Sequence, residues 1–295
     1  MTTANDPKMR AAKLSCWSGA VDPEPIPGGL TNTNFLVRDR GRSYFVRIGE
    51  DDPFHNILRF NELAASRAAQ AVGISPAVIH SQEGVIVTDF IEGRTLASDD
   101  VRDQKTLARI VPLIQTCHRD IPTNLRGPVS MFWVFHVIRD YTATVCQANQ
   151  EAISEMDMFL AKAANLERSV GKTNIVFGHN DLLAANIIDD GDRLWLVDWD
   201  YAGFNSPLFD LAGLASNSEL GADAEMHLLT AYYGQDPDRD LLTRFHAMKC
   251  ASLLRETLWS MVSEIHSTLD VDFAAYTRQN LARFDREYEE LERTT

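Results

Sequence analysis

The pattern of apolar and polar positions changes about ninety residues into the chain. Before that point, short apolar runs alternate with turn residues, which is typical of strands. Residues 34–38 and 42–48 form two such runs, separated by a short Asp-Arg-Gly turn, and together they predict a hairpin. Residues 77–80 and 84–91 predict two further strands.

A stretch of helical spacing separates these two pairs of strands. Pro53 suits the first turn of a helix, apolar residues recur at roughly helical spacing from Phe54 to Ala64, and Gly73 is a stop signal. The first part of the chain is therefore predicted to run strand, strand, helix, strand, strand.

From about Leu96 the apolar spacing becomes mainly helical. Five helical segments are predicted, at residues 105–118, 131–167, 222–233, 238–265 and 272–292. Only the region 175–199 interrupts them, with strand-like runs at 174–177 and 193–197. The pattern predicts an α+β protein with a small sheet-rich lobe (residues 1–91) and a larger, mainly helical lobe (residues 92–295), hinged near Glu92-Gly-Arg-Thr.

Polar residues gather where the strand-like runs of this region end. The segments are His179-Asn-Asp-Leu-Leu-Ala-Ala-Asn186 and Leu194-Trp-Leu-Val-Asp-Trp-Asp200. A phosphoryl-transfer enzyme must orient the acceptor hydroxyl and hold Mg²⁺ on the phosphates. Asp181 suits the first task as the catalytic residue, and Asn186 and Asp198 offer the hard oxygen ligands that Mg²⁺ prefers. Each residue alone is more often an ordinary turn residue, but the combination predicts a magnesium-dependent phosphoryl-transfer site.

These segments also resemble a known family. His179-x-Asp-x-x-x-x-Asn186 followed by Val197-Asp-Trp-Asp-Tyr201 is similar to the motifs of the aminoglycoside phosphotransferase and choline kinase superfamily, and most similar to bacterial choline/ethanolamine kinase-like proteins. The resemblance implies a protein-kinase-like two-lobe fold with a nucleotide-binding N-lobe. It also implies that His179 holds the loop and that Asp210 braces it. Asp200 is either a further acidic group near the metal and substrate or an exposed side chain.

The resemblance extends to the N-terminal lobe. Gly28-Gly-Leu-Thr-Asn-Thr-Asn34 resembles the nucleotide loop of the family, although alone it would be an ordinary hairpin entry. The loop residues implied to contact ATP are Gly29, Thr31, Asn32 and Asn34.

The same lobe supplies a basic residue and a linker. Arg47 stands where protein kinases have a strand lysine, and a guanidinium can fork onto phosphate oxygens. Its expected partner is Glu62, which would otherwise lie on a solvated helix face. The segment 88–92 resembles the linker that binds adenine, with Asp89 and Ile91 as the implied contacts.

The acceptor side rests on aromatic residues near the C-terminus. Cationic alcohols such as choline are recognised by aromatic faces together with an acidic group. Trp259, Phe273 and Tyr276 are the candidate faces, although aromatics at this spacing are also typical of a core. The choline kinases tend to have two tryptophans three positions apart where this chain has Glu256 and Trp259. One wall of the ammonium cage is therefore missing, and a carboxylate there favours a cation with N–H groups, such as ethanolamine.

The predicted function is an ATP- and Mg²⁺-dependent kinase that phosphorylates a small cationic alcohol, choline first and ethanolamine next. Thiamine, an aminoglycoside or a sugar is an alternative acceptor within the superfamily. A catalytically silent kinase fold used as a binding module is a further alternative. Such a module should lack Asp181, Asn186 or Asp198, and this chain keeps all three.

Charge and cysteine content bear on the partners and the cellular location of the protein. The formal net charge of -14 argues against a nucleic-acid partner and suits a cationic ligand, although an acidic surface also serves solubility. Four cysteines without ligand spacing predict reduced thiols, and we expect no membrane span and a cytoplasmic location. The sequence does not distinguish a monomer from a homodimer.

Overall fold

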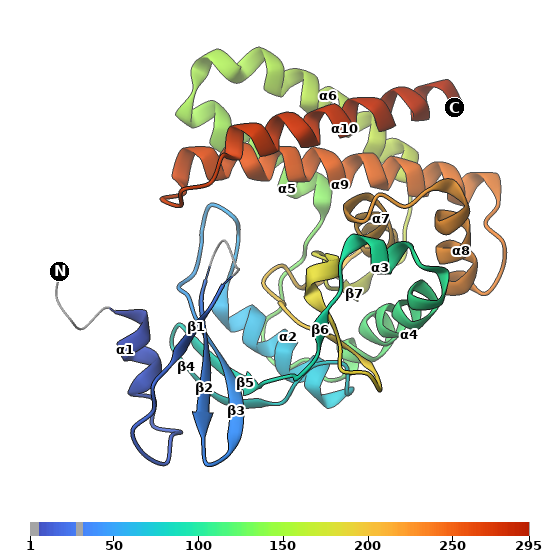
Figure 1. The fold of residues 1–295 in the computed structure, drawn as a ribbon. Coiled ribbons are helices and arrows are strands. Elements are labelled where there is room, and N and C mark those ends of the chain that lie inside the picture. The colour runs from blue at the N-terminus through green and yellow to red at the C-terminus, as the bar shows by residue number, and fades with distance from the viewer. Residues whose placement is uncertain (1–5, 28–31, 295) are drawn as a thin grey trace.

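The computed structural model describes residues 6–27 and 32–294 (Figure 1). The N-terminal part is built around an antiparallel five-stranded sheet with the order β1-β2-β3-β5-β4. The strands are β1 (Glu24–Ile26), β2 (Thr33–Asp39), β3 (Arg42–Ile48), β4 (Val78–Gln82) and β5 (Val85–Asp89). The predicted hairpin is confirmed: β2 and β3 pair along their whole length, and the turn between them places Arg40 and Gly41 at positive φ.

Strand alternation divides the side chains of this sheet between two environments. One set, which includes Phe35, Val46 and Val87, packs against α1 (Pro7–Ala12) in a small core. The residues between them, Phe45 and Arg47 among others, therefore point the opposite way, into a cleft. The period of two thus delivers the polar residues of β2 and β3 to the site described below.

Helix α2 (Arg59–Ala71) begins later than predicted. The expectation of a start at Pro53 is wrong, because the residues before Arg59 form a closed loop. Asp52 and Ile57 exchange two backbone hydrogen bonds of 2.9 Å, and Asp52 Oδ1 accepts from the backbone N–H of Phe54. The backbone groups of this loop are therefore hydrogen-bonded without a helix. The predicted end of the helix at Gly73, which has a φ of 77°, is confirmed.

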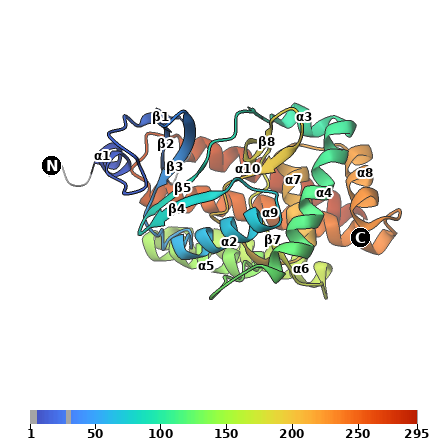
Figure 2. The same cartoon turned by 90° about the horizontal axis from the view of Figure 1, so that it is seen from below.

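The rest of the chain is mainly helical (Figures 1 and 2). The helices are α3 (Ser98–Arg102), α4 (Gln104–Asp120), α5 (Val134–Ala148), α6 (Ile153–Val170), α7 (Pro207–Asn217), α8 (Ala222–Tyr233), α9 (Arg239–His266) and α10 (Phe273–Thr294). Helix α9 packs against α5, α6, α7 and α10, which explains why it is buried on nearly all sides. Within the described residues, no helix is both long and apolar enough to span a membrane.

One prediction about the helices is wrong, and one helix was not predicted. The segment 131–167 contains two helices and not one, because Asn149 leaves the helical conformation and its side chain accepts from the backbone N–H of Glu151 at 3.0 Å. Helix α7 was not predicted: it is buried along almost its full length, so it has no polar face and shows no amphipathic period.

The mainly helical part also contains two small antiparallel sheets. Strand β7 (Val176–Gly178) pairs with β10 (Gly203–Asn205), and β8 (Ile187–Asp189) lies between β6 (Arg94–Thr95) and β9 (Leu194–Leu196). These pairings hold the loops that follow β7 and β9. The α+β architecture agrees with the prediction, while a lobe boundary at residues 91 and 92 stays a prediction.

Candidate active site

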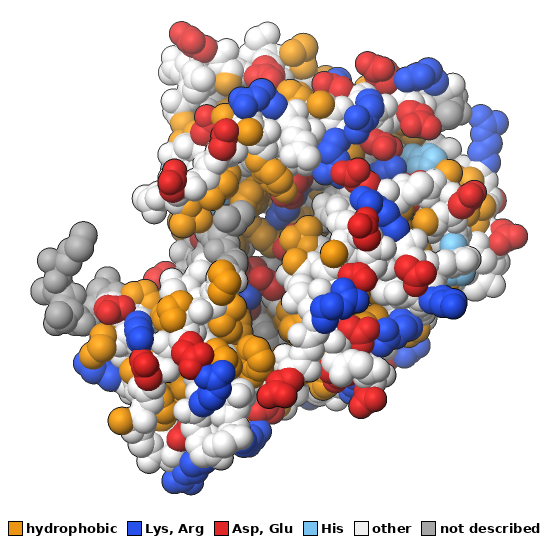
Figure 3. Space-filling model, in the orientation of Figure 1, with side chains coloured by type: hydrophobic (Ala, Val, Ile, Leu, Met, Phe, Trp, Pro, Cys, Tyr) orange, Lys and Arg blue, Asp and Glu red, His pale blue; other side chains and the backbone are white. Residues whose placement is uncertain are grey.

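A cleft of about 440 Å³ lies beside the sheet. Figure 3 shows the molecule hollowed between the sheet-bearing part and the helices, with acidic and basic side chains inside the hollow. The predicted nucleotide-binding residues that line the cleft are Asn34, Arg47, Glu62, Asp89 and Ile91. Both predicted metal ligands, Asn186 and Asp198, line the same cleft. The predicted residues Gly29 and Thr31 lie outside the described residues.

The linker segment borders the apolar part of this cleft. Phe90, Ile91 and Ile188 of β8 all line it, and such apolar side chains suit a flat apolar ring. The side chain of Asp89 accepts from Arg42 Nη2 at 2.7 Å. A contact between Asp89 and adenine would therefore use backbone groups, and Ile188 is a lining residue that the sequence analysis missed.

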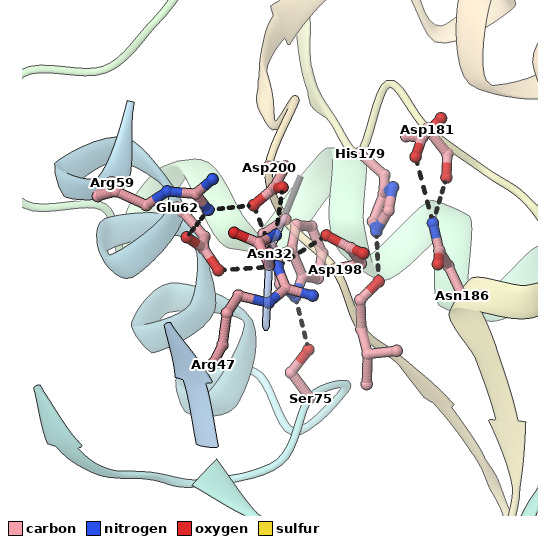
Figure 4. A network of polar contacts seen from close by, with 12 residues as sticks. Asn32, Arg47, Arg59, Glu62, Ser75, His179, Asp181, Asn186, Asp198 and Asp200 are labelled. Atoms are coloured by element: carbon pink, nitrogen blue, oxygen red, sulfur yellow. Dashed lines mark hydrogen bonds and ion pairs between the residues drawn. The ribbon is translucent and has the colours of Figure 1, made fainter. Parts of the chain in front are cut away.

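A cluster of charged side chains forms the floor of the cleft (Figure 4). Arg47 Nη1 lies 2.9 Å from Glu62 Oε1, so the ion pair expected from the sequence is present. The same nitrogen lies 2.8 Å from Asp198 Oδ1 and 3.0 Å from Asp200 Oδ1. Burial opposes the positive charge of Arg47, but these three carboxylates outweigh it and hold the pKa of the guanidinium well above its ordinary value.

A second arginine, which the sequence analysis missed, completes the cluster. Arg59 Nη1 contacts Glu62 Oε2 at 2.7 Å and Asp200 Oδ1 at 2.8 Å. Asn32 Nδ2 donates to Asp200 Oδ2 at 3.0 Å. Asp200 is only 5% exposed, so the alternative of an exposed side chain is wrong. Three carboxylates face two guanidiniums, which leaves the cluster with a formal charge of -1.

The loop after β7 is held by buried polar contacts. Asp210, in the first turn of α7, accepts from the backbone N–H groups of His179 and Asn180 at 2.8 and 2.7 Å. Asp210 also lies 2.9 Å from His118 Nε2. His179 Nε2 donates to the backbone carbonyl of Val197 at 2.9 Å, which ties this loop to the strand end that carries Asp198. These are contacts that a supporting role for His179 and Asp210 requires.

Asp181 and Asn186 face each other across this loop (Figure 4). Asn186 Nδ2 donates to the backbone carbonyl of Asp181 at 2.9 Å and lies 3.4 Å from Asp181 Oδ2. Burial, aided by the negative charges of Glu256 and Asp198 and opposed by the guanidinium of Arg255, raises the pKa of Asp181 to about 7. A carboxyl with a pKa near 7 is suited to accept a proton at neutral pH.

The donor set at Asn186 and Asp198 fits a magnesium ion. Within residues 6–27 and 32–294 there is no group of three or more His, Cys, Asp or Glu side chains that could enclose a metal. Magnesium does not need one, because it retains waters and takes phosphate oxygens as ligands. The amide nitrogen of Asn186 is used by Asp181, so the amide oxygen remains for a cation. Asp198 is held at a positive φ of 69°, an uncommon conformation that occurs often at functional sites.

The predicted acceptor residues lie together on α9 and α10. The ring of Trp259 is 6.0 Å from that of Phe273 and 6.3 Å from that of Tyr276, both in edge-on arrangements. Trp259 Nε1 donates to the Tyr201 hydroxyl at 2.8 Å. Phe273 is buried, as its alternative reading as a core residue expects, whereas Tyr276 is 38% exposed.

The carboxylate of Glu256, which was predicted to favour a cation, already has two hydrogen-bond partners. Its two oxygens accept from Arg255 Nη1 at 2.7 Å and from the Tyr276 hydroxyl at 2.8 Å. The guanidinium of Arg255 is buried, and it lies 4.5 Å from the centre of the Tyr201 ring and 5.6 Å from that of Phe132. Arg255 was missed, although an Arg-Glu pair inside the otherwise uncharged stretch 250–263 was a signal that could have found it.

Known proteins resemble this chain over most of its length. A family model described as choline/ethanolamine kinase matches residues 24–226. The protein LicA of Haemophilus influenzae is 28% identical over 279 residues, which cover 90% of this chain and 78% of LicA. The probable ethanolamine kinase A of Dictyostelium discoideum is 26% identical over 298 residues, which cover 90% of this chain and 84% of that protein.

A solved structure matches the fold as well. The choline/ethanolamine kinase family protein from Mesorhizobium loti superposes with a TM-score of 0.75 at 26% identity, covering 97% of this chain and 96% of that chain. The match confirms the predicted fold class, a kinase-like arrangement of a small antiparallel sheet and a larger helical part.

Proposed function

The chain belongs to the choline/ethanolamine kinase family, and we propose on this basis that it transfers the γ-phosphate of ATP to the hydroxyl of choline or ethanolamine. The observation that carries the proposal is the contact between Asp181 and Asn186 on a loop whose Asn186 lines the same cleft as Asp198. This arrangement offers one group for the acceptor hydroxyl and two oxygen ligands for a metal.

Each side chain has a proposed role in the transfer. Asp181 orients the acceptor hydroxyl and takes its proton as the bond to phosphorus forms. Asn186 and Asp198 would hold Mg²⁺, which when bound neutralises charge on the phosphates. Arg47 directs its guanidinium toward the phosphates while Glu62 holds it in place. His179 and Asp210 keep the loop in shape.

The aromatic groups on α9 and α10 support a cationic acceptor. Trp259 and Tyr276 are neighbouring aromatic side chains of the kind whose ring faces bind ammonium groups. Glu256 is already shared by Arg255 and Tyr276, so it attracts a cation less strongly than a free carboxylate would. We therefore place choline first and ethanolamine next. The other acceptors of the superfamily remain outcomes of the test, and a cytoplasmic location remains a prediction.

The test is turnover by purified protein with ATP and Mg²⁺ against choline, ethanolamine, thiamine, an aminoglycoside and a sugar, with ADP release as the readout. We expect turnover with choline or ethanolamine. Turnover with none of the five acceptors would favour the silent-kinase alternative, whereas turnover with thiamine, the aminoglycoside or the sugar alone would reject the cationic alcohol and keep the reaction.

Substitution of the two carboxylates should separate chemistry from nucleotide binding. We expect Asp181→Ala to lower kcat by about 10³-fold, since general-base groups contribute roughly 10²–10⁴-fold, and to leave ATP affinity within about twofold. Asp198→Ala should remove the dependence of ATP affinity on Mg²⁺. ADP release measures kcat, and calorimetric titration of ATP with and without Mg²⁺ measures the ATP affinity of each variant. Unchanged turnover by Asp181→Ala would rule out this mechanism.

A further inference from the structure

A loop from the sheet-bearing part reaches the acceptor helices. The β3–α2 loop (residues 49–58) extends from the sheet toward the turn where α9 ends and α10 begins (Figure 1). Phe54 stacks on His266 of α9 with ring centres 3.6 Å apart. Asn56 Nδ2 donates to Asp140 Oδ2 of α5 at 2.8 Å. The loop is thus attached to two helices of the C-terminal part.

His55 is the buried residue of this loop. It is only 6% exposed, and its ring centre lies 5.1 Å from that of Trp259 with an angle of 33° between the planes. The imidazole also meets Tyr141 edge-on at 5.8 Å, and its Nε2 lies 3.0 Å from Ser263 Oγ. Trp259 and Ser263 are one turn apart on α9, so His55 rests on the face of α9 that carries the predicted acceptor residue.

The imidazole of His55 is neutral at physiological pH. Burial, opposed by Asp52 and aided by Arg255 and His266, lowers its pKa to about 4. A neutral ring can border a cation site, whereas an imidazolium would repel the ligand. His55 Nδ1 is buried without a hydrogen-bond partner among the described residues. The contact between His55 Nε2 and Ser263 Oγ holds the ring against the indole of Trp259.

We propose that His55 is a positioning residue for the acceptor, because it backs the indole of Trp259 and fixes the angle at which Trp259 meets the cationic head group. The inference rests on the proposed function. Tyr201 holds the indole nitrogen, and Tyr276 and Phe273 meet the ring from α10. Among the described residues, three rings contact Trp259: Phe273 and Tyr276 belong to α10, whereas His55 belongs to the sheet-bearing part.

The position of His55 in the chain gives the contact a further consequence. The β3–α2 loop continues directly into Arg59 and Glu62 of the charged cluster. The wall of the acceptor site and the floor of the nucleotide cleft therefore share one segment of chain. A displacement of this loop would change the orientation of Trp259 without breaking any contact of Asp181 with Asn186.

The test compares His55→Ala with His55→Phe. We expect His55→Ala to raise the KM for the cationic alcohol about fivefold or more and to leave kcat and the KM for ATP within about twofold, since the lost contact acts on acceptor binding alone. His55→Phe keeps a ring against the indole and should restore most of the acceptor KM. Asn56→Gly is the matched control: it removes the contact with Asp140 at a positive φ of 58°, where glycine is unstrained, and should leave the acceptor KM unchanged.

A double-mutant cycle with Trp259→Phe then tests whether His55 acts through Trp259. The two changes should be clearly less than additive in acceptor KM, since residues in contact couple. Additive effects, an unchanged acceptor KM in His55→Ala, or an equal rise in Asn56→Gly would each overturn the inference. If His55→Ala does not fold, His55→Leu replaces it with the same expectation. A wild-type protein that turns over no cationic alcohol would reject the proposed function and this inference with it, whereas an active wild type with an unaffected His55→Ala rejects the inference alone.

Discussion

Asp181 is the residue whose ionisation should govern the reaction. Burial raises its pKa to about 7, so the carboxyl is protonated below that pH and cannot accept the hydroxyl proton. We expect kcat/KM to increase with pH up to about 7 and to level off above it. Choline is the right acceptor for this profile, because its quaternary ammonium does not titrate. A profile that is flat down to pH 5 would contradict the role of Asp181 as a base.

Arg255 provides a control for the cause of that pH dependence. Its positive charge opposes the increase in the pKa of Asp181. Arg255→Met should therefore move the rise in kcat/KM toward higher pH, by about one unit for the loss of a nearby opposite charge. Arg255→Lys keeps the charge and should move it less. A shift in the opposite direction would show that another group controls the profile.

The sequence could predict some of these residues and not others for a physical reason. Asp181, Asn186 and Asp198 lie within one stretch of chain, where fixed spacing between oxygen ligands is visible. Arg59 meets Asp200 across 141 positions, and such a contact exists only after the chain has folded. His55 is not one of the apolar positions in the segment that was predicted to be helical from Phe54 to Ala64, so the pattern did not indicate its burial.

At the scale of secondary-structure elements, side-chain periodicity predicted the interiors of helices and strands better than their ends. Helix α4 agrees with its predicted range to within two residues because its buried residues recur at helical spacing, from Leu107 and Ile110 to Ile114 and Cys117. The start of α2 was misplaced because Pro53 is a good first helical residue, while the closed loop at Asp52 depends on hydrogen bonds that carry no sequence period. Helix α7 was not predicted because it is buried on all sides and therefore has no alternation of apolar and polar faces.

Arg59, the first residue of α2, should stabilise the fold through its ion pairs in the charged cluster. Arg59→Ala should lower the free energy of unfolding by about 3 kcal/mol, because removing one member of a buried ion pair leaves the other charge uncompensated. The substitution removes one cationic partner of Glu62 and Asp200, the carboxylates that also hold Arg47 beside the nucleotide cleft. ATP affinity should therefore decrease more than acceptor affinity. Urea denaturation and separate titrations of the two substrates measure these effects. Arg59→Lys is the control and should be intermediate, because an ammonium group lacks the planar fork of donors.

At the scale of the whole molecule, two substrates of opposite charge must enter one acidic protein. The chain carries a formal net charge of -14, while the guanidinium of Arg47 is buried in the floor of the cleft and that of Arg59, whose side chain is 11% exposed, contacts the same carboxylates of Glu62 and Asp200. The long-range field therefore attracts a cationic alcohol and repels ATP, and the arginines act on the nucleotide only at short range. Dissolved salt screens the first effect far more than the second, because buried charges are little exposed to ions.

The two substrates should consequently respond to salt in opposite directions. When NaCl is raised from about 20 mM to about 200 mM, the Debye length falls from roughly 20 Å to roughly 7 Å. We expect the KM for choline to increase and the KM for ATP to decrease, each by about two- to threefold, with Mg²⁺ held in constant excess. Sucrose at matched osmolality is the control, because it changes water activity without screening charge. If both KM values move in the same direction, the net charge of the chain serves solubility and does not guide its substrates.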